Sequence, residues 1–459
     1  MQVRPDDGVT VGIDIGSSAL KAVAVDPSGD VVASFRRRHR LALPSADRME
    51  HEAGKAWRSA PRSALAWLSR EVERIRGSGA TVRGVCVAGL VPSLAAVDDR
   101  GVPCSPGLLY GDARGAVATA SPASPRPVKS SSAPVGHAPD LLRFCASVAP
   151  GAAGYWPAQA VANCALTGRG VVDISTAMSM APLYDGYEWS SGQVRASGAD
   201  PAQLPAVVTL GAAVGAWRDA AVASGIVDTL AEQLVAGATD DGDVLVICGT
   251  TLVIWIVTSA WREVPGLWTV PHTEPGKVLV GGASNAGGLF LDWARRLTGP
   301  GPAASPPGAH VPVWAPYPRG ERTPLHDPDR RAMLVDLQLS DDAAGVRRAA
   351  YEATGFVVRQ HIDLAGIPAR RLVVTGGGGH DAEWMSALAD TTGLPAEVVA
   401  VPEGAALGAA FVARIAAGLE RSVSDAGRWV RGGRRFEPDA VAVEAAERRY
   451  QLFRGVSAQ

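Results

Sequence analysis

The stretch Val11-Gly12-Ile13-Asp14-Ile15-Gly16-Ser17-Ser18, near the N-terminus, decides how the rest of the chain is interpreted. An apolar strand runs into a turn of small residues, and such turns leave backbone N–H groups able to meet phosphate oxygens. A second copy of the pattern, Val246-Ile247-Cys248-Gly249-Thr250-Thr251, lies near the middle of the chain. Two related turns suggest a nucleotide held by two related lobes, so phosphoryl transfer is the first hypothesis.

Length and composition limit the classes of protein that fit. A chain of 459 residues is too long for one hydrophobic core, and we expect two domains, at 1–243 and 244–459. The apolar fraction of 47% and charged fraction of 20% are ordinary for a globular protein and exclude general disorder. A net charge of −2 gives no basic excess, so no nucleic-acid partner is expected.

The cysteines and the N-terminus bear on the cellular compartment. The five cysteines are odd in number and share no CxxC spacing, which favours reduced core residues. The N-terminus lacks the apolar segment of a secretory signal, and no apolar run reaches the ~18 residues of a membrane helix. We therefore expect a cytoplasmic protein with no membrane partner. The histidines have no HExxH-type spacing, so a transition metal held by protein ligands is not expected.

Hairpins followed by strand–helix units occur twice, which predicts a duplicated α/β architecture. Residues 116–138 are rich in Ala, Ser and Pro and predict a loop-like insert. The elements expected in the first half are strands at 9–15, 19–25, 31–36, 82–88 and 94–97, and helices at 53–76, within 138–167 and at 229–237. In the second half, strands are expected at 244–248, 252–257 and 371–375, and a strand at 277–280 is expected to end in a third turn. Helices are expected at 286–297, 342–364, 382–392 and 405–417. The last two of these helices are expected to close the second lobe.

Asp14 carries the strongest chemical signal. A carboxylate on a buried strand is costly unless a cation pairs with it, and the residues that follow it suit phosphate binding. We predict that Asp14 faces a hydrated Mg²⁺ on the phosphates of a nucleotide. The alternative is an aspartate that hydrogen-bonds the turn it precedes. The residues expected to contact the nucleotide in this turn are Gly16, Ser17, Ser18 and Lys21.

Nine motifs, in the expected order over nearly the whole chain, resemble the FGGY carbohydrate kinases of the actin/Hsp70/sugar-kinase superfamily. They are Gly12–Ser18 with Lys21, Leu109–Arg114, Leu166–Gly168, Gly225–Asp228, Gly249–Thr251, Gly281–Ala283, Gly320–Pro324, Thr375–Gly378 and Gly404–Ala410. The resemblance implies two ribonuclease-H-like domains flanking a deep cleft, ATP and Mg²⁺ as cosubstrates, and a sugar or polyol as phosphate acceptor. FGGY kinases are often dimers, so a homodimer is expected.

The resemblance also assigns roles to two carboxylates. Asp228 is implied to be the general base that accepts the proton of a sugar hydroxyl, and so also to contact the substrate. Because Asp228 precedes the good helix former Thr229–Leu234, the alternative is an N-cap, and both roles are compatible. Asp112 is implied to bind substrate hydroxyls, with an Asp112–Arg114 surface pair as the alternative.

Two glycine-containing turns are expected to bind the nucleotide. Gly249, Thr250 and Thr251 would cradle phosphates with backbone N–H groups and hydroxyls. The run Gly376-Gly377-Gly378-Gly379 costs conformational entropy on folding, which a close approach of backbone to the adenosine would explain.

Among subfamilies the chain looks nearest to xylulokinase-like members, but it departs from them at the sugar. Where xylulokinases typically have Gly-Gln-Met-His, this chain has Gly89-Leu90-Val91-Pro92. Pro92 offers no polar side chain and no N–H, so a hydrogen bond to a sugar hydroxyl is lost, and Val91 is the candidate substrate contact in this turn. The acceptor is therefore expected to be a pentulose such as xylulose or a related sugar or polyol.

The expected activity is ATP-dependent phosphorylation of a small carbohydrate by in-line transfer. The alternative is a catalytically weak sugar or nucleotide sensor on the same fold, suggested by Pro92 and a shortened 116–150 region. The presence of both Asp14 and Asp228 favours the enzyme, because a pure binder needs neither a metal carboxylate nor a base. An actin-like filament protein would leave the sugar-kinase motifs unused.

Overall fold

The computed structural model describes residues 8–45, 47–77, 79–115, 138–302, 310–400 and 403–457. The chain forms two compact units, and the first contains residues up to 115, 138–235 and 403–429 among those described. The second contains 236–400 and 430–457. Residues 403–429 therefore fold with the first unit although they come late in the chain. The predicted insert at 116–138 lies, but for Ala138, outside the described residues.

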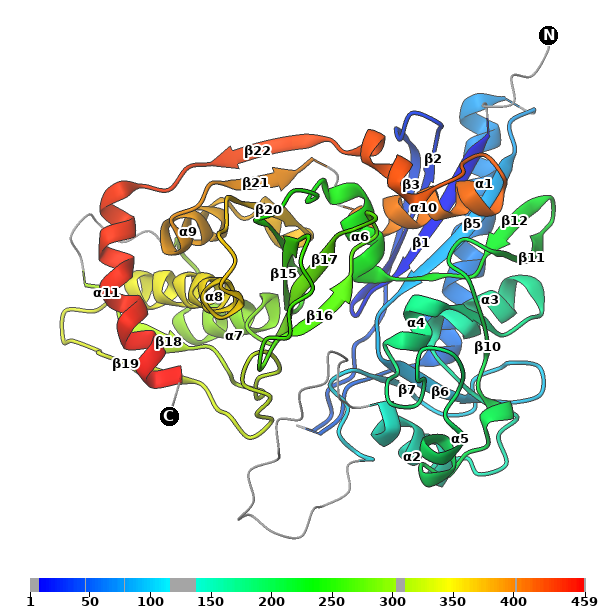
Figure 1. The fold of residues 1–459 in the computed structure, drawn as a ribbon, viewed down its shortest axis with the longest axis horizontal. Helices are drawn as coiled ribbons and strands as arrows, with labels where there is room; N and C mark the ends of the chain where they lie inside the picture. The colour runs from blue at the N-terminus through cyan, green and yellow to red at the C-terminus, as the bar shows by residue number, and fades with distance from the viewer. Residues whose placement is uncertain are drawn as a thin grey trace. The chain divides into compact units, whose positions relative to one another are not determined.

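A mixed seven-stranded sheet forms the centre of the first unit (Figure 1). Its strands run in the order β11-β12-β5-β1-β2-β3, and β13 also pairs with β5. β1 pairs antiparallel with β2 and parallel with β5, and β5 in turn pairs parallel with β12 and β13. The strands are β1 (Val9–Ile15), β2 (Ala19–Val25), β3 (Val31–Arg38), β5 (Val82–Gly89), β11 (Ala213–Trp217), β12 (Ala220–Ala223) and β13 (Ile226–Val227).

The rest of the first unit consists of helices and short strands. A four-stranded sheet contains β4 (Glu50–His51), β7 (Gly107–Leu109), β6 (Ser93–Val97) and β8 (Gly154–Trp156), and a parallel pair contains β9 (Val171–Asp173) and β10 (Ala206–Val208). The helices are α1 (Ala60–Arg76), α2 (Ala138–Val148), α3 (Ala158–Thr167), α4 (Ile174–Met178), α5 (Ser191–Ala196), α6 (Asp228–Ala236) and α10 (Gly404–Ala416), with a π-helical turn η1 (Gly54–Ser59) and 3₁₀ turns η2 (Pro201–Gln203) and η4 (Val423–Trp429).

The second unit has its own seven-stranded sheet, in the order β16-β17-β15-β14-β20-β21-β22. Its strands are β14 (Asp243–Cys248), β15 (Leu252–Thr258), β16 (Trp268–Pro271), β17 (Val278–Ser284), β20 (Arg371–Thr375), β21 (Ala396–Val399) and β22 (Gly432–Phe436), and β18 (Val313–Ala315) pairs with β19 (Met333–Val335) outside it. The helices are α7 (Gly288–Thr298), α8 (Ala343–Ala365), α9 (Ala382–Thr392) and α11 (Ala440–Ser457), with the 3₁₀ turn η3 (Gly377–His380).

The two sheets repeat one sequence of pairings. Reading from β3 through β2, β1, β5 and β12 to β11, the pairs are antiparallel, antiparallel, parallel, parallel and antiparallel. The same series runs from β17 through β15, β14, β20 and β21 to β22. The duplicated α/β architecture predicted from the sequence is confirmed. The assignment of a sugar side to residues 1–243 and an ATP side to residues 244–459 stays a prediction.

The helices expected within 138–167 are present as α2 and α3, with the short strand β8, which was not predicted, between them. Two other expectations about local structure are wrong. The predicted third turn after residue 280 is the continuation of β17, whose residues 281–283 pair with β15. The helix predicted at 405–417 exists as α10, but it packs on the sheet of the first unit rather than closing the second (Figure 1).

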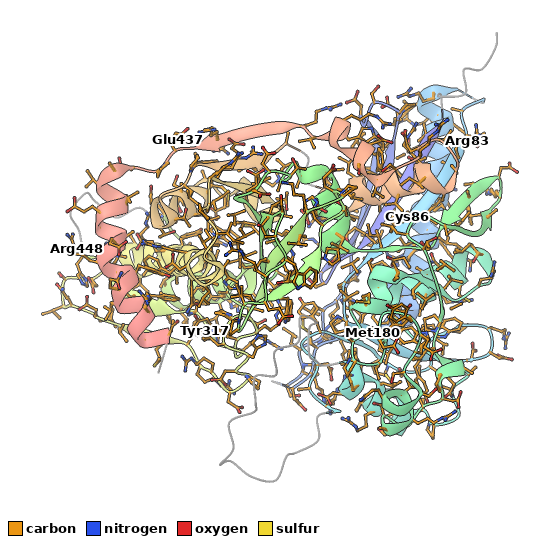
Figure 2. All side chains as sticks on the ribbon, viewed as in Figure 1. Arg83, Cys86, Met180, Tyr317, Glu437 and Arg448 are labelled. Carbon is orange, nitrogen blue, oxygen red and sulfur yellow. The ribbon has the colours of Figure 1, made fainter. Side chains whose placement is uncertain are left out.

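Each unit has its own apolar core, built on the two faces of its sheet. The inward-facing residues of β1, β2 and β5 are fully buried, and Cys86 on β5 is among the side chains of the first unit in Figure 2. In the second unit Tyr317 is buried and its hydroxyl shares a hydrogen bond of 2.8 Å with Ser457 at the end of α11. All five cysteines are free, as expected; four are buried and Cys104 is exposed.

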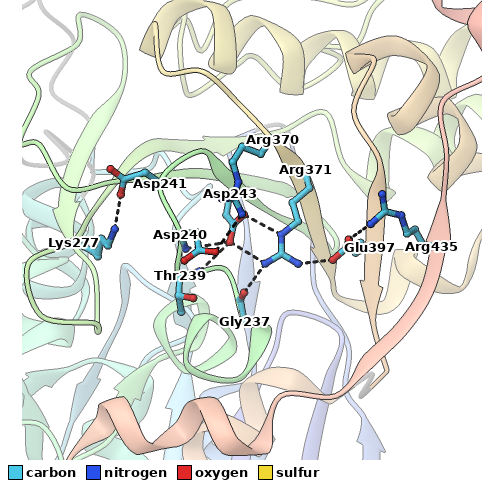
Figure 3. A network of polar contacts seen from close by, with 10 residues as sticks. All are labelled: Gly237, Thr239, Asp240, Asp241, Asp243, Lys277, Arg370, Arg371, Glu397 and Arg435. Carbon is cyan, nitrogen blue, oxygen red and sulfur yellow. Dashed lines mark hydrogen bonds and ion pairs between the residues drawn. The ribbon is translucent and has the colours of Figure 1, made fainter.

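A network of charges stabilises the amino-terminal end of the second sheet (Figure 3). The buried carboxylate of Asp243 on β14 accepts hydrogen bonds of 2.9 and 3.0 Å from Arg371 on β20, and Arg371 also pairs with Glu397 on β21. Glu397 in turn pairs with Arg435 on β22. Burial works in the opposite direction, but Arg371 holds the pKa of Asp243 below its ordinary value. The ion pairs link four neighbouring strands.

Candidate active site

The sheet of the first unit brings two predicted carboxylates to one edge. Asp14 of β1 and Ile226 of β13 are both level with Ala88 of β5, because both strands run parallel to β5 on its two sides. β13 ends one residue later and Asp228 follows at once. The turn that begins at Gly16 and the N-terminus of α6 therefore leave the same carboxyl edge, two strand spacings or about 10 Å apart. Carboxyl edges of parallel strands are where α/β proteins bind ligands.

The environment of Asp14 makes its ionised form costly. Burial raises the pKa of Asp14 to about 6, and the nearby charge of Lys21 lowers it in part. Lys21 lies directly opposite Asp14 in the antiparallel ladder of β1 and β2. No hydrogen bond to the Asp14 side chain is found among the described residues. A carboxylate with this pKa gains stability when a cation binds it.

The donor groups at this edge fit a magnesium ion held mainly by substrate and water. In the part of the chain that the structure describes, no three His, Cys, Asp or Glu side chains are grouped closely enough to hold a metal. Mg²⁺ commonly uses one or two protein carboxylates and completes its shell with water and phosphate oxygens. Asp14 has an oxygen donor of the required kind.

Asp228 is the first residue of α6. Its carboxylate accepts a hydrogen bond of 2.7 Å from the N–H of Thr229, and its side chain is partly exposed. This contact is with the next residue, whereas an N-cap accepts from the N–H two or three residues on, so the capping role stays a prediction. The N-terminus of a helix favours the ionised carboxylate, which is the form that a general base needs.

Helix α10 fixes these two carboxylate-bearing elements with respect to each other. A Cβ on Gly12 of β1 would lie 1.8 Å from the carbonyl oxygen of Ala406, and a Cβ on Gly408 would lie 1.8 Å from that of Ala231 on α6. The hydroxyl of Thr10 donates a hydrogen bond of 2.9 Å to Ala410 on the same helix. Glycine is therefore required at both contacts, since no side chain has room.

The turn after β5 leaves the sheet between the two carboxylates. It contains Val91 and Pro92, both partly exposed. Asp112 is buried, and its carboxylate accepts hydrogen bonds from the N–H of Met49 at 3.0 Å and from Arg114 at 2.7 to 3.3 Å. Arg114 also pairs with Glu50. The Asp112–Arg114 pair expected as the alternative exists, but it is buried rather than on the surface.

The turn Gly16–Ser18 has anchors that the sequence analysis missed. The N–H of Gly16 donates 3.1 Å to Ala19, which closes the turn. The carbonyl oxygen of Gly16 accepts from His39 Nε2 at 2.8 Å, and that of Ser17 accepts from His51 Nε2 at 2.7 Å. The two histidines have no ligand-like spacing in sequence, and they meet because β3 and β4 bring them under one turn.

The second unit brings its two predicted nucleotide turns together. β14 and β20 are parallel, with Ile247 level with Thr375, so Gly249–Thr251 and Gly376–Gly378 leave the same edge on neighbouring strands. The carbonyl oxygens of Gly249 and Thr250 accept hydrogen bonds of 2.9 and 3.0 Å from Gly288 and Leu289 at the start of α7.

Packing within the second unit accounts for part of the glycine run. Gly376 has a positive φ of 86°, and a Cβ there would lie 2.7 Å from the carbonyl oxygen of Cys248. A Cβ on Gly378 would lie 2.3 Å from the ring of Trp384. A Cβ on Gly377 would meet nothing within 4 Å. Contact with the adenosine is therefore not needed to explain Gly376 and Gly378, and for all three residues it stays a prediction.

Comparison with known proteins gives consistent matches. Residues 244–417 match the FGGY family of carbohydrate kinases, C-terminal domain. Xylulose kinase of Escherichia coli (strain K12) is 25% identical, with 97% of each chain covered. The crystal structure of xylulose kinase from Rhodospirillum rubrum has a TM-score of 0.79 at 26% identity, covering 98% of both chains. That of Plasmodium falciparum glycerol kinase with ADP has a TM-score of 0.78 at 15% identity, covering 99% of both, which shows a shared fold.

The fold, the family match and the relatives define the class of this protein as an ATP-dependent carbohydrate kinase of the actin/Hsp70-like fold. Within that class, residues 244–417 match the C-terminal domain of the FGGY carbohydrate kinases, and the chain as a whole is similar to xylulose kinases. The resemblance and the ribonuclease-H-like fold expected from the sequence are confirmed. Across the described ranges, no helix has both the length and the apolar character needed to span a membrane.

Proposed function

We propose that this chain transfers the γ-phosphoryl group of MgATP in line to a hydroxyl of a small carbohydrate, with Asp228 as the general base. One observation carries the proposal: β1, β5 and β13 end at the same level, so that Asp14 and Asp228 lie at one edge of one sheet. A metal carboxylate and a base are the two side-chain functions that phosphoryl transfer to an alcohol requires.

Asp228 acts on the acceptor. Because a sugar hydroxyl is a weak nucleophile near neutral pH, its proton passes to the Asp228 carboxylate as the bond from oxygen to phosphorus forms. The N-terminus of a helix favours a negative charge, which suits a carboxylate that acts as a base there. The contacts of α6 with α10 hold the element that carries Asp228 in place. Closure over the substrates would exclude water, which otherwise competes with the sugar as acceptor.

The remaining predicted residues bind the nucleotide. Asp14 would hold Mg²⁺, which when bound neutralises charge on the β- and γ-phosphates. Gly16, Ser17, Ser18 and Lys21 of the first unit, and Gly249, Thr250 and Thr251 of the second, are proposed to contact phosphates. Gly376, Gly377 and Gly378 are proposed to lie against the adenosine.

The substrate is proposed to be a pentulose such as xylulose, or a related sugar or polyol, because xylulose kinases match nearly the whole chain at about 25% identity. Val91 is the proposed contact in the turn after β5, where Pro92 cannot donate a hydrogen bond. Asp112 remains a candidate ligand of a sugar hydroxyl, but direct contact requires one of its bonds to Arg114 to give way. The homodimer and the cytoplasmic location also stay predictions.

An ADP-release assay with a panel of ketoses, aldoses and polyols tests this proposal. We expect a sugar-dependent rate that falls by about 10³-fold or more in Asp228→Ala, while the Kd for MgATP stays near the parental value. Asp219→Ala, which removes an exposed carboxylate in the turn between β11 and β12, is the matched control and should keep the parental rate.

Two outcomes would contradict the proposal. Parental turnover by Asp228→Ala would show that another group is the base. A sugar-induced rise in melting temperature with no turnover on any sugar would support the second candidate, a sensor on the same fold. The replacement of a polar side chain by Pro92 favours that candidate, because it removes a hydrogen bond from the sugar side.

A further inference from the structure

Two histidines of the first unit contact the backbone of the turn between β1 and β2. His39 follows β3 and is partly buried, whereas His51 lies in β4 and is buried. Their rings meet edge to face, with centroids 4.5 Å apart. Each Nε2 atom contacts one carbonyl of the turn, His39 that of Gly16 and His51 that of Ser17.

The hydrogen bonds fix which nitrogen carries the proton. A carbonyl oxygen can only accept, so the Nε2 atom of each histidine must be protonated. The indole N–H of Trp57 donates 3.0 Å to His51 Nδ1, so this atom carries no proton and His51 is neutral. His39 Nδ1 is buried and has no partner among the described residues. Protonation of this atom would therefore leave a buried N–H donor without an acceptor. Burial lowers the pKa of both histidines, that of His51 to about 4.

The hydrogen bonds to the Gly16 and Ser17 carbonyls also set the direction of two N–H groups. In a planar trans peptide the C=O of one residue and the N–H of the next point in opposite directions. The bond from His39 to the Gly16 carbonyl therefore directs the N–H of Ser17 away from the histidines. The bond from His51 to the Ser17 carbonyl does the same for the N–H of Ser18. These are the N–H groups that the turn would offer to phosphate oxygens.

The second unit fixes the corresponding peptide planes by other means. Gly249 and Thr250 occupy the places in the turn after β14 that Gly16 and Ser17 occupy after β1. Their carbonyl oxygens also each accept one hydrogen bond, from the backbone N–H groups of Gly288 and Leu289. Two anchored carbonyls are thus common to both turns, although the donors are imidazoles in one and backbone amides in the other.

We propose that His39 and His51 are positioning residues for the nucleotide, which orient the N–H groups of Ser17 and Ser18 through the carbonyls of Gly16 and Ser17. The inference rests on the proposed function, because it takes the ligand of this turn to be a nucleotide phosphate. Neither histidine touches the phosphates. Their contribution is to keep the turn in its binding conformation before the ligand arrives, which lowers the entropy cost of binding.

Substitutions of His39 test this inference most cleanly, because its second ring nitrogen has no partner to lose. In His39→Leu the donor to the Gly16 carbonyl is removed, and in His39→Gln the side-chain amide can still donate from the position of Nε2. We expect the Kd of the full chain for MgATP, measured by calorimetry, to rise roughly tenfold in His39→Leu and to stay within about twofold in His39→Gln. The KM for ATP should follow the Kd, and the KM for the sugar should not change.

The same comparison at His51 gives a second test. His51→Leu removes the acceptor of the indole N–H of Trp57 as well as the donor to Ser17. His51→Gln keeps the donor to Ser17, so the comparison of the two variants shows whether loss of stability alone explains any effect. His310→Leu is the matched control in the second unit, where His310 contacts Asp336 and Asp341 rather than either turn. It should leave the Kd for MgATP unchanged.

The possible outcomes separate this inference from the proposed function. Folded His39→Leu with the parental Kd, or equal weakening by His39→Leu and His39→Gln, would overturn the positioning role. Absence of MgATP binding by the parental chain would overturn the proposed function and this inference together. If Asp228→Ala keeps parental turnover while His39→Leu weakens MgATP binding and His39→Gln does not, the base is wrongly assigned and the positioning role stands.

Discussion

The first unit has Asp14 two residues before the glycine that begins the turn after β1. In the second unit, the equivalent position before the turn after β14 is the buried Ile247. Both turns join an antiparallel hairpin whose first strand also pairs with a parallel neighbour. Both also have two anchored carbonyls. The duplicated parts of the molecule thus share their strand pairing and their anchored carbonyls but differ in charge. This difference teaches that the repeated hairpin does not itself bring a charge, because the carboxylate proposed to hold Mg²⁺ occurs in the first unit alone.

The two hairpins also differ at the position two residues before Asp14 in β1 and two residues before Ile247 in β14. β1 has Gly12, where α10 lies directly on the strand, and β14 has the buried Leu245. Figure 1 shows α10, in orange, against the blue strands of the first sheet. The first strand thus gives up a side chain so that a helix can approach it, and the second strand keeps an ordinary apolar residue.

The largest expected effect is on this helix contact. Gly12→Ala would place a Cβ 1.8 Å from the carbonyl oxygen of Ala406, so the helix must shift and the free energy of unfolding should fall by about 3 kcal/mol. Denaturant unfolding measures the change. Gly54→Ala is the control, because its Cβ would meet nothing within 4 Å. Equal stability of the two variants would show that α10 does not depend on Gly12.

The next effect tests the charge difference between the turns. Asp14 has a pKa of about 6 in the folded chain and an ordinary value of 3.8, so the native state loses stability as pH rises from about 4 to 6. Asn cannot ionise, and Asp14→Asn should therefore unfold with up to about 3 kcal/mol more free energy above pH 6, and with no gain below pH 4.

Thermal or urea unfolding in metal-free buffer across this pH range measures that gain. Asp219→Asn removes an exposed carboxylate and should show no such pH-dependent difference. A gain for Asp14→Asn that is the same at pH 4 and pH 7 would mean that the cost of Asp14 is not electrostatic.

The smallest effect concerns the turn of the second unit. Thr250→Val keeps the backbone N–H groups and the anchored carbonyls but removes a hydroxyl, so the KM for ATP should rise by roughly five- to tenfold, with little change in the sugar KM. Initial-rate kinetics at saturating sugar measure it. Thr298→Val, on α7, is the control, because its hydroxyl bonds to Ala294 within the same helix. An unchanged KM for ATP in Thr250→Val would limit the turn to backbone contacts.

Local patterns predicted the parts of this structure that local physics determines. The strand–turn–strand pattern around Asp14 and Gly16 gave β1 and β2 correctly, since apolar runs and small turn residues act over a few positions. The same reasoning found α6, α8 and α9. It failed at β8, a short strand of three residues between helices, because so few residues carry little periodicity.

Long-range contacts explain the other omissions. The sequence of α10 predicts a helix but does not show that Gly12, nearly four hundred residues earlier, is its packing partner. The contacts of His39 and His51 with one turn likewise depend on β3 and β4 meeting in space. No spacing within the sequence records either event. The roles of Asp14 and Asp228 came from motif resemblance, and the sheet register adds a physical reason for pairing them.

The late return of α10 to the first unit has a consequence for synthesis of the chain. β1 and β5 are synthesised early, yet the helix that covers them is made only after residues 236–400 of the second unit. Until then the face of the nascent sheet around Gly12 and Gly84 has no cover. The unit whose strands are translated first therefore stays incomplete until residues 403–429 have been made, late in synthesis.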